Sequence, residues 1–454
     1  MLHWIDSRLG VASWARSGLR KIFPDHWSFL LGEVALFCLV VLVLTGVFLT
    51  LFYIPDAELV VYEGSYAPLV GHEVSRAYAS VLDLSFEVRA GLVMRQIHHW
   101  AALVFVAAIT VHLMRVFFTG AFRRPREINW LVGIGLLLLS LAMGITGYSL
   151  PDDLLSGTGL RIIYSAVIGI PIIGPYLAFL LFGGEFPTET IISRLFVFHV
   201  MLFPALLIGG VLVHLAILWR QKHTQWAVPG ATERNVVGRP FWPSQVFKST
   251  GLLLLTSAVL AFMGGVVQIN PIWTYGPFDP NTVSAPAQPD WYVGWLDGAL
   301  RLFPPVEFTV LGITIPTVFV PAIVIPGIAF AIMTLWPFIE PRLTGDHDEH
   351  HILERPRDNA LRTSIGVAGL LVFVVLTVAG GNDVAALVLN VPVETTTELL
   401  RIGFFVVPLA GFAVTYRICR ELQRRTDVAD PRRPVRLRRT ATGGFEEVEQ
   451  GPGR

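Results

Sequence analysis

Residues 94–120 read MRQIHHWAALVFVAAITVHLMRVFFTG, an apolar run that carries histidines in its interior. The run is long enough to cross a bilayer as one helix, because about 20 apolar residues span the hydrocarbon core. The sequence positions of His98 and His112 differ by 14. This interval is close to four helical turns, so their side chains share one face and lie roughly 21 Å apart along the axis. The helix therefore presents one imidazole near each face of the membrane.

A second apolar run, residues 194–219, repeats this arrangement in the sequence RLFVFHVMLFPALLIGGVLVHLAILW. The positions of His199 and His214 differ by 15, which corresponds to roughly 22 Å along a helix. Two such helices side by side would bring the four imidazoles together as two opposed pairs. The pattern predicts two haems with bis-histidine ligation, stacked across the membrane. The expected ligand pairs are His98 with His199 and His112 with His214.

Each intramembrane histidine also has a simpler interpretation, as a packing residue held by hydrogen bonds. Paired histidines at matched spacing favour cofactor ligation, because ionisable side chains in lipid are costly and usually functional. A zinc site is disfavoured, since the two histidines of each helix are too far apart to share one ion. A haem-free transporter that relays protons through these histidines remains an alternative.

The composition favours an integral membrane protein over a soluble domain. The chain has 454 residues, of which 53% are hydrophobic and 15% charged, and its mean hydropathy is +0.61. The formal net charge is +0, which gives no sign of a nucleic-acid partner. The two cysteines, Cys38 and Cys419, allow neither an iron–sulfur site nor a CxxCH attachment motif. The haems are therefore expected to be non-covalent.

Eight segments have the length and hydropathy of membrane spans. The predicted fold is an all-α membrane protein with eight transmembrane helices, of which the first four form a di-haem bundle. No cleavable signal precedes the first span, and residues 16–27 are expected to form an amphipathic surface helix. The expected spans are residues 29–53, 93–118, 130–150, 194–219, 249–270, 308–338, 364–379 and 399–418.

The distribution of lysine and arginine indicates the orientation. These residues gather in the N-terminal segment, in every second connection and in the tail, whereas the loop after the fifth span contains only Arg301. The positive-inside rule therefore places both termini in the cytoplasm of a multi-pass cell-membrane protein. With this orientation, His98 and His199 lie on the outer side, and His112 and His214 lie on the inner side.

Glycines repeat the histidine spacing in the first and third spans. The positions of Gly32 and Gly46 differ by 14, as do those of Gly133 and Gly147. A flat porphyrin requires neighbours without side chains where it passes close to the backbone, and only glycine meets that need. The alternative is helix–helix packing through small residues. The shared spacing favours haem clearance.

Cationic and hydrogen-bonding side chains at the ends of these spans are candidates for the haem propionates. Arg95, Arg115 and Arg194 lie close in sequence to the histidines, and Trp130 could add a donor on the inner side. The alternatives are snorkelling arginines and an interfacial aromatic residue. His99 points about 100° away from His98 and is not expected to be a ligand.

The paired histidines, the spaced glycines and the loop AQPDWY at residues 287–292 resemble cytochrome b of the cytochrome bc complex. The resemblance covers residues 20–420, with all eight spans in register. The passages QINPIWTYGP at 268–277 and LTGDHDEHHILERPRD at 343–358 look like the actinobacterial subunit. This resemblance implies menaquinol as the electron donor, an iron–sulfur (Rieske) subunit and a cytochrome c subunit as partners, a homodimer, and a supercomplex with a terminal oxidase.

The family oxidises quinol at the outer face, in a pocket with a Pro-Glu-Trp-Tyr motif. Here the family's glutamate is an aspartate, which is one methylene shorter, and its carboxylate is expected to accept a quinol proton. Tyr148 matches a tyrosine of the same pocket, and residues 157–174 are expected to form short helices that cover it. A loop with a Pro-Asp turn and no catalytic role is the alternative. The matching residues are Pro289, Asp290, Trp291 and Tyr292.

The inner quinone-reducing site is less evident. The family uses a histidine after the fourth helix and a Lys-Asp pair at the start of the fifth. Here the pair reads Lys248-Ser249, so the carboxylate is missing, and His223 is shifted in register. The histidines of GDHDEHH (His347, His350 and His351) resemble a metal cluster but are expected to be solvated.

The chain is thus expected to have four parts. These are a cytoplasmic amphipathic N-terminus (1–28), a di-haem four-helix bundle (29–222), C-terminal transmembrane helices with the quinol-site loop (223–420), and a polar cytoplasmic tail (421–454) that is disordered or docks a partner. The resemblance implies that quinol oxidation outside sends electrons through both haems to an inner quinone. A di-haem membrane anchor of a dehydrogenase or hydrogenase, with one quinone site, is the alternative function.

Overall fold

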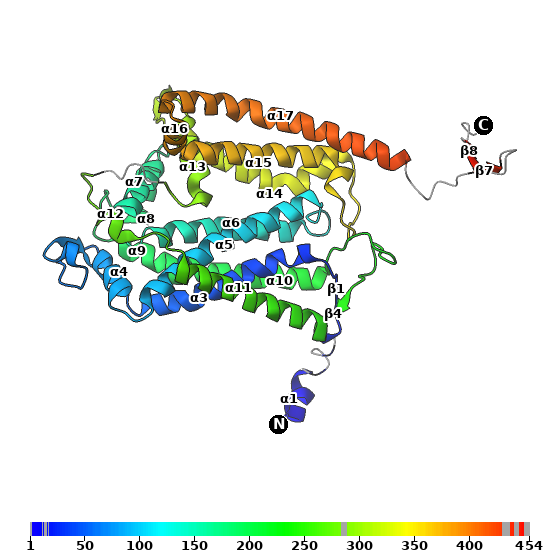
Figure 1. The fold of residues 1–454 in the computed structure, drawn as a ribbon, viewed down its shortest axis with the longest axis horizontal. Helices are drawn as coiled ribbons and strands as arrows, with labels where there is room; N and C mark the ends of the chain where they lie inside the picture. The colour runs from blue at the N-terminus through cyan, green and yellow to red at the C-terminus, as the bar shows by residue number, and fades with distance from the viewer. Residues whose placement is uncertain are drawn as a thin grey trace.

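The computed structural model describes residues 2–10, 12, 16, 18–282, 288–428, 436–439 and 445–448. Within these residues, eight helices are long and apolar enough to cross a membrane, and Figure 1 shows them running side by side. The predicted all-α architecture with eight spans is confirmed. The spans are Trp27–Thr50, Gly91–Phe118, Glu127–Tyr148, Ile191–Gln221, Phe241–Val266, Val320–Thr344, Ala360–Gly380 and Val393–Arg425.

Three of the spans contain a π-helical turn. The spans are built from η1 (Trp27–Phe29) and α3 (Leu31–Thr50); α5 (Gly91–Phe118); α6 (Glu127–Tyr148); α9 (Ile191–Val197), η3 (Phe198–Leu202) and α10 (Phe203–Gln221); η4 (Phe241–Gln245) and α11 (Val246–Val266); η5 (Val320–Val324) and α14 (Ile325–Thr344); α15 (Ala360–Gly380); and α17 (Val393–Val428). The π-helical turns are η3, η4 and η5.

Short elements connect the spans. The remaining helices are α1 (Leu2–Leu9), η2 (Ala67–Leu69), α4 (Arg76–Phe86), α7 (Leu154–Ile168), α8 (Gly174–Phe182), α12 (Ile272–Tyr275), α13 (Trp291–Leu302), η6 (Pro356–Asp358) and α16 (Asn382–Leu389). The strands form four antiparallel pairs: β1 (Ile22–Phe23) with β4 (Arg239–Pro240), β2 (Leu59–Val61) with β3 (Glu73–Ser75), β5 (Phe308–Val310) with β6 (Ile313–Ile315), and β7 (Arg436–Arg439) with β8 (Phe445–Val448).

The helices pack as two groups. In the first, α3 packs along α5, α10 packs along α6, and α11 covers α3 and α5. Small buried side chains such as Ala35, Cys38 and Ala101 let the helices of this group approach closely. In the second group, α15 packs against α13 and α17. The start of α3 and the end of α17 lie at the same end of the bundle (Figure 1), as an even number of spans requires.

Three predicted boundaries were wrong. The sixth span begins at Val320 rather than residue 308, because residues 308–315 carry β-branched residues on both sides of a tight turn at Leu311-Gly312 and form the β5–β6 hairpin. The amphipathic helix expected over residues 16–27 does not continue past residue 20, because β1 pairs with β4 there; residues 17 and 13–15 lie outside the described part. The last helix continues to Val428, into the segment expected to be a disordered tail. Residues 429–435, 440–444 and 449–454 of that tail lie outside the described residues.

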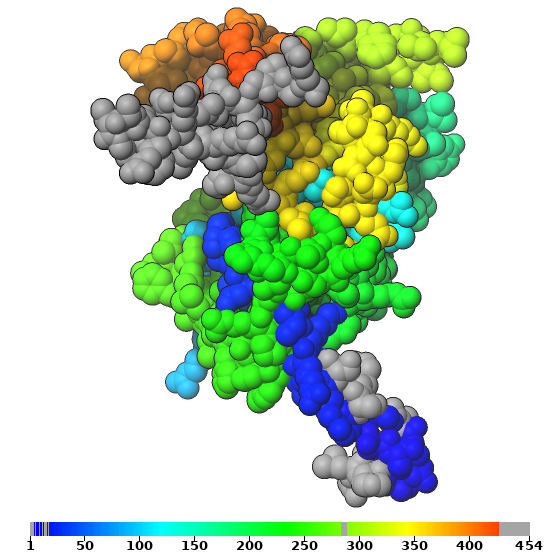
Figure 2. All heavy atoms as spheres, turned by 90° about the vertical axis from the view of Figure 1, so that its right-hand side faces the viewer, coloured from blue at the N-terminus to red at the C-terminus, as the bar shows by residue number. Residues whose placement is uncertain are grey.

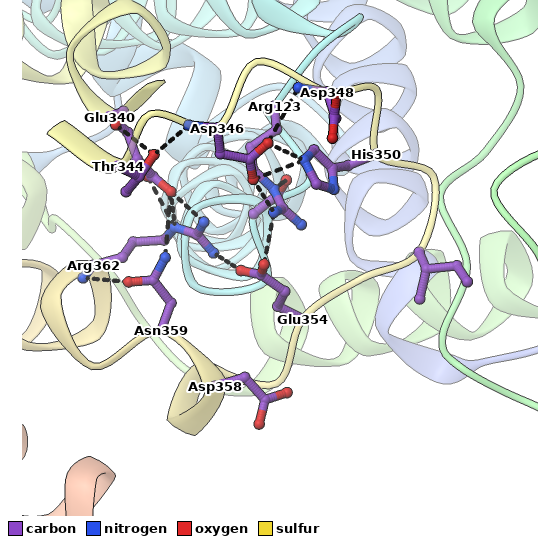
Figure 3. Close-up of polar contacts among 12 residues, drawn as sticks. Arg123, Glu340, Thr344, Asp346, Asp348, His350, Glu354, Asp358, Asn359 and Arg362 are labelled. Carbon is purple, nitrogen blue, oxygen red and sulfur yellow. Dashed lines mark hydrogen bonds and ion pairs between the residues drawn. The ribbon is translucent and has the colours of Figure 1, made fainter. Parts of the chain in front are cut away.

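One end of the bundle is held together by a buried ion network (Figure 3). The guanidinium of Arg362 is 1% exposed and donates to both carboxylate oxygens of Glu340. Its Nη1 donates to Glu354 at 2.7 Å, and the same carboxylate accepts from Arg123 at 2.6 Å. The network joins α15, the end of α14, the connection between them and the loop after α5.

We expect Arg362→Met to destabilise the protein by about 3–5 kcal/mol, because it leaves the carboxylate of Glu340 buried without its cation. Thermal unfolding of the purified protein measures the loss. The matched control is Arg425→Met, which breaks an ion pair whose arginine is 76% exposed and is expected to change stability by less than about 1 kcal/mol. Equal effects of the two substitutions would show that the network contributes no more than a surface pair.

The histidines of the connection between α14 and α15 lie beside this network. His347 and His350 line a cavity of about 310 Å³, and His350 contacts Asp346 at 3.0 Å. His351 contacts Arg126 at 2.8 Å. Among the residues that the structure describes, no group of three or more His, Cys, Asp or Glu is arranged to hold a metal ion. The side chains of His350 and His351 make polar contacts here, whereas His347 contributes its backbone carbonyl to a hydrogen bond from Arg124.

The same connection is tied to the segment that follows the fourth span. Gln225 donates its N–H to the carbonyl of His351, and Leu353 donates to the carbonyl of Gln225. Figure 2 looks at this end of the molecule and shows the connection (yellow) beside the 222–240 segment (green). Backbone hydrogen bonds therefore join the α14–α15 connection to the segment after the fourth span.

Candidate functional site

The four histidines of the second and fourth spans meet between α5 and the α9–α10 span. The ring centroids of His98 and His199 are 6.2 Å apart, with an angle of 70° between the rings. His112 lies near His214, its partner in the second predicted pair. A separation of 6.2 Å leaves room for a metal ion at roughly 2 Å from a nitrogen of each ring. The predicted partners are thus brought together.

A π-helical turn explains why the two histidine pairs differ in spacing by one position. His199 lies in η3, and Pro204 follows in the first turn of α10, where it has no N–H to donate to the preceding turn. A π turn takes up one residue more than an α turn. The longer interval from His199 to His214 therefore completes the same number of turns as the interval from His98 to His112 in α5.

Each of the four spaced glycines faces one of the four histidines. A Cβ atom added to a glycine would lie closer to the ring than most side chains allow in three cases and at ordinary contact distance in the fourth. This arrangement explains the shared spacing, since glycine and histidine positions lie at matching depths. The distances from the added Cβ to Cε1 of the ring are 2.4 Å for Gly147 and His199, 3.2 Å for Gly32 and His112, 3.3 Å for Gly46 and His98, and 3.7 Å for Gly133 and His214.

Two threonines orient one pair of rings, and the sequence reasoning missed them. Thr45 Oγ1 lies 2.9 Å from Nδ1 of His98. Thr146 Oγ1 lies 3.3 Å from Nδ1 of His199, which also contacts the carbonyl of Met143 at 3.0 Å. A hydrogen bond at Nδ1 leaves Nε2 available as a ligand. The available signal was a Thr-Gly dipeptide at residues 45–46 and again at 146–147.

The other pair of rings has no such partners. Nδ1 of His112 and Nδ1 of His214 are buried, and neither has a hydrogen bond among the described residues. Arg115 is also buried with Nε and Nη2 unpartnered, and its guanidinium carbon lies 4.4 Å from the ring centre of Phe29. Buried unpartnered donors are rare in proteins. They fit a site built for an anionic cofactor.

The predicted propionate partners differ in whether their donor groups already make hydrogen bonds. Arg95 is buried, its Nε is unpartnered and its Nη2 donates to the carbonyl of Asn270 at 3.0 Å. By contrast, Nη1 of Arg194 donates to the carbonyls at the end of α8 at 2.7 and 3.1 Å. Trp130 Nε1 donates to the carbonyl of Met333 at 2.7 Å. Arg95 and Arg115 thus have free donors, whereas these donors of Arg194 and Trp130 bind carbonyls.

At the opposite end from the ion network, Asp290 is held between two side chains. Its Oδ1 lies 3.2 Å from Nε2 of His99, and its Oδ2 accepts from the hydroxyl of Tyr292 at 3.3 Å. The side chain of Asp290 is 18% exposed and that of His99 is 15% exposed. Burial and the neighbouring carboxylate raise the pKa of Tyr292, so it remains a hydrogen-bond donor. The contact with His99 was not expected from the sequence, which separates the two residues by 191 positions.

Short helices surround this carboxylate. The hydroxyl of Tyr292 lies so close to Gly144 that a Cβ there would be 2.4 Å from it. Tyr148 ends α6, and α7 passes over it, with an added Cβ at Gly159 3.9 Å from its ring. The neighbouring pair Pro289 and Trp291 lines a cavity of about 470 Å³ between α13, α15 and α16. The cover of short helices expected over residues 157–174 is present as α7 and the start of α8.

Two buried carboxyl groups precede α7. Asp153 caps the helix by accepting from the N–H groups of Leu155 and Ser156. Burial raises the pKa of Asp152 to about 6 and raises that of Asp153. Both groups therefore hold protons more tightly than exposed aspartates do, in the segment that covers Tyr148.

The candidate residues of the inner quinone-reducing site do not form a single cluster. Lys248 binds Asp25 rather than a buried group, and both side chains are about two-fifths exposed. His223 is buried beside Phe23, with its ring 4.4 Å from the phenyl ring, and its Nδ1 is unpartnered. Burial, with the nearby Lys21 and two arginines, lowers the pKa of His223 to about 4, so it is neutral at pH 7.

Known proteins match the chain over most of its length. A family model described as "Cytochrome b(N-terminal)/b6/petB" matches residues 103–277. The cytochrome bc1 complex cytochrome b subunit of Streptomyces coelicolor is 49% identical over 450 residues, which cover 98% of this chain and 82% of the relative. That of Mycobacterium tuberculosis is 51% identical over 421 residues, covering 92% and 76%.

A solved structure described as "Hyperthermophilic respiratory Complex III" covers 93% of this chain and 99% of its own, with a TM-score of 0.68 at 20% identity. At that identity it supports the fold alone. The sequence relatives confirm the predicted resemblance. The chain belongs to the cytochrome b subunits of the cytochrome bc1 complex, of the actinobacterial type.

Proposed function

We propose that this subunit of a quinol–cytochrome c oxidoreductase holds two non-covalent b-type haems and carries electrons between two quinone sites. The observation that carries the proposal is the pairing of four half-buried histidines inside the spans, with the centroids of one pair 6.2 Å apart. His98 and His199 would hold the outer haem, and His112 and His214 the inner haem. A b-type haem supplies a one-electron iron couple whose properties depend on its ligands and hydrogen bonds.

The chain's own residues prepare these sites. Thr45 and Thr146 fix the rings of the outer pair through Nδ1. The free donors of Arg95 and Arg115 are the proposed propionate partners, one at each end of α5. Gly32, Gly46, Gly133 and Gly147 keep side chains away from the four rings. Arg194 and Trp130 stay predicted propionate contacts, which would require them to exchange a carbonyl partner.

The outer quinol site is proposed at Asp290, between His99 and Tyr292. The carboxylate would accept a proton from the quinol hydroxyl, and the Tyr292 hydroxyl would stabilise it by donating a hydrogen bond. Tyr148 lies under the α7 cover of the same region. Pro289 and Trp291, the sequence neighbours of Asp290, line an apolar cavity of about 470 Å³ between α13, α15 and α16, and Asp290 itself is not part of that lining. Menaquinol is the proposed donor.

The name of the relatives supports assembly into a bc1 complex, and we propose an iron–sulfur (Rieske) subunit and a cytochrome c subunit as the partners. We further propose a homodimer and association with a terminal oxidase. Both termini are proposed to be cytoplasmic, in the cell membrane. The inner site, with Lys248 near it, would reduce a quinone and take protons from the cytoplasm, so that turnover moves protons outward.

A reduced-minus-oxidised spectrum of the purified complex, with a haem-to-protein ratio, tests the proposal together with quinol-driven cytochrome c reduction. Two b haems per chain and reduction of cytochrome c by a menaquinol analogue are expected. A complex without b haem would support a proton-relaying transporter. Two haems without cytochrome c reduction, in an otherwise complete complex, would argue against the proposed outer quinol site.

Among the four spaced glycines, Gly147 is expected to be the one whose replacement by alanine lowers haem content most. Gly147→Ala would place a Cβ 2.4 Å from Cε1 of His199, closer than real side chains approach, so the ring or the helix must shift. We expect this variant to lose much of the outer haem. Gly133→Ala is the matched control, because its Cβ would lie 3.7 Å from His214. Haem content and the spectrum of each variant provide the measurement, and full haem in Gly147→Ala would argue against close packing at this ring.

A further inference from the structure

The carboxylate missing from the Lys248-Ser249 pair is present in space, on another helix. Glu33, in the first turn of α3, accepts a hydrogen bond from the hydroxyl of Ser249 at 2.7 Å. Its other oxygen accepts from Nε2 of Gln245 at 2.8 Å. Both donors come from the start of the fifth span. The side chain of Glu33 therefore lies where a carboxylate at position 249 would reach.

Glu33 also lies at the depth of the inner histidine pair. It directly follows Gly32, whose added Cβ would lie 3.2 Å from Cε1 of His112. One turn earlier on the same face, the ring of Phe29 contacts the guanidinium of Arg115 at 4.4 Å. A half-buried carboxylate at the depth of the proposed inner haem occupies a position from which a proton could be delivered to a quinone there.

Aromatic rings and unpartnered donors gather around residues 23–29, which precede Glu33 in the chain. The ring of His26 is 5.4 Å from Trp226 and 6.2 Å from Phe29. Nε1 of Trp226 and Nδ1 of His223 are buried, and neither is hydrogen-bonded within the described residues. Flat rings together with unpartnered donors suit the head group of a quinone, which is planar and carries two carbonyl acceptors.

Exposed charged side chains lie next in sequence to the serine that binds Glu33. Asp25 binds both Lys248 and Arg239, and its side chain is 39% exposed. Lys248 precedes Ser249, the residue that donates to Glu33. Protons lost from Glu33 can thus be replaced from water on the side where the N-terminal segment lies.

We propose that Glu33 is the proton donor of the inner quinone-reducing site and replaces the carboxylate that the family carries at position 249. The inference rests on the proposed function. Reduction of a quinone to a quinol consumes two electrons and two protons, and a b-type haem held by the inner pair would supply the electrons in two successive one-electron transfers. The O–H bond of the Glu33 carboxyl breaks as a quinone oxygen gains the proton. Water on the inner side then reprotonates the carboxylate for the second transfer.

The experiment uses the purified complex with Asp290→Asn, after loss of quinol-driven cytochrome c reduction has shown that the outer site is blocked. Complex that has been reduced with dithionite and freed of the excess is mixed with a short-chain naphthoquinone, and oxidation of the b haems is followed by stopped flow. Glu33→Gln is expected to slow this oxidation about 10²-fold, the typical contribution of a general acid. Glu33→Ser combined with Ser249→Asp is expected to recover most of the rate, because it returns the carboxylate to the family's position. Glu421→Gln, which removes an exposed carboxylate on α17, is the matched control and is expected to keep the starting rate.

The outcomes separate this inference from the proposed function. If the naphthoquinone oxidises the haems equally fast with Glu33→Gln, Glu33 is not the donor. If Glu33→Gln is slow but the exchanged carboxylate gives no recovery, the residue has a structural role and the inference is also overturned. If the haems are not oxidised even with Glu33 in place, the inner quinone site itself is absent, and the proposed function fails.

Discussion

Replacement of His98 by alanine is expected to remove one b haem from the purified complex and to leave the other. The two proposed haems use separate ligand pairs, roughly 21 Å apart along α5, so loss of one imidazole should not release the distant haem. His214→Ala is expected to remove the haem that His98→Ala retains. The haem-to-protein ratio would fall from about two to about one in each variant, with different residual spectra.

His99→Ala is the matched control for these variants. His99 neighbours His98 in sequence but contacts Asp290 instead of the histidine pair. We therefore expect this variant to keep both haems, whatever its effect on turnover. If His98→Ala and His214→Ala both kept the full haem complement, bis-histidine ligation would be wrong. If either variant lost both haems, the two sites would not be independent.

The chemistry of the bundle was largely predictable from the sequence, because helical periodicity converts spacing into position. The matched intervals between histidines and between glycines indicated depth and face, and the structure brings these glycines and histidines together. The π turn at His199 was not predicted. The π turn depends on Pro204 and on the packing of the whole span. The longer interval between His199 and His214 was the one sign of it in the sequence.

Contacts between distant segments could not be predicted. His99 with Asp290, Glu33 with Ser249, and Arg362 with Glu340 each join different helices, and nothing in the local pattern shows which helices are neighbours. The start of the sixth span failed for a different reason. A run of apolar β-branched residues is compatible with a helix or a hairpin, and the turn at residues 311–312 decides between them.

Asp290→Asn is expected to lower quinol-driven cytochrome c reduction by about 10²–10⁴-fold while leaving the haem content unchanged. The amide keeps the shape of the side chain but cannot accept the quinol proton. The contact with His99 and the hydrogen bond from Tyr292 can both persist in the variant, so folding should be preserved. Turnover with a menaquinol analogue and the haem spectrum measure the two effects on the same preparation.

Asp290→Glu is the matched control, since it restores the residue of the family's Pro-Glu-Trp-Tyr motif. The glutamate has the same chemistry and one more methylene, so we expect turnover to stay within about tenfold of the starting protein. Tyr292→Phe removes one hydrogen bond to the carboxylate, worth about 1.5–3 kcal/mol when the acceptor is charged. Its turnover should therefore lie between those of Asp290→Asn and Asp290→Glu. If Asp290→Asn kept as much turnover as Asp290→Glu, the carboxylate of Asp290 would not be the proton acceptor and the loop would only shape the pocket. The carboxyl groups of Asp152 and Asp153 would then be the next candidates.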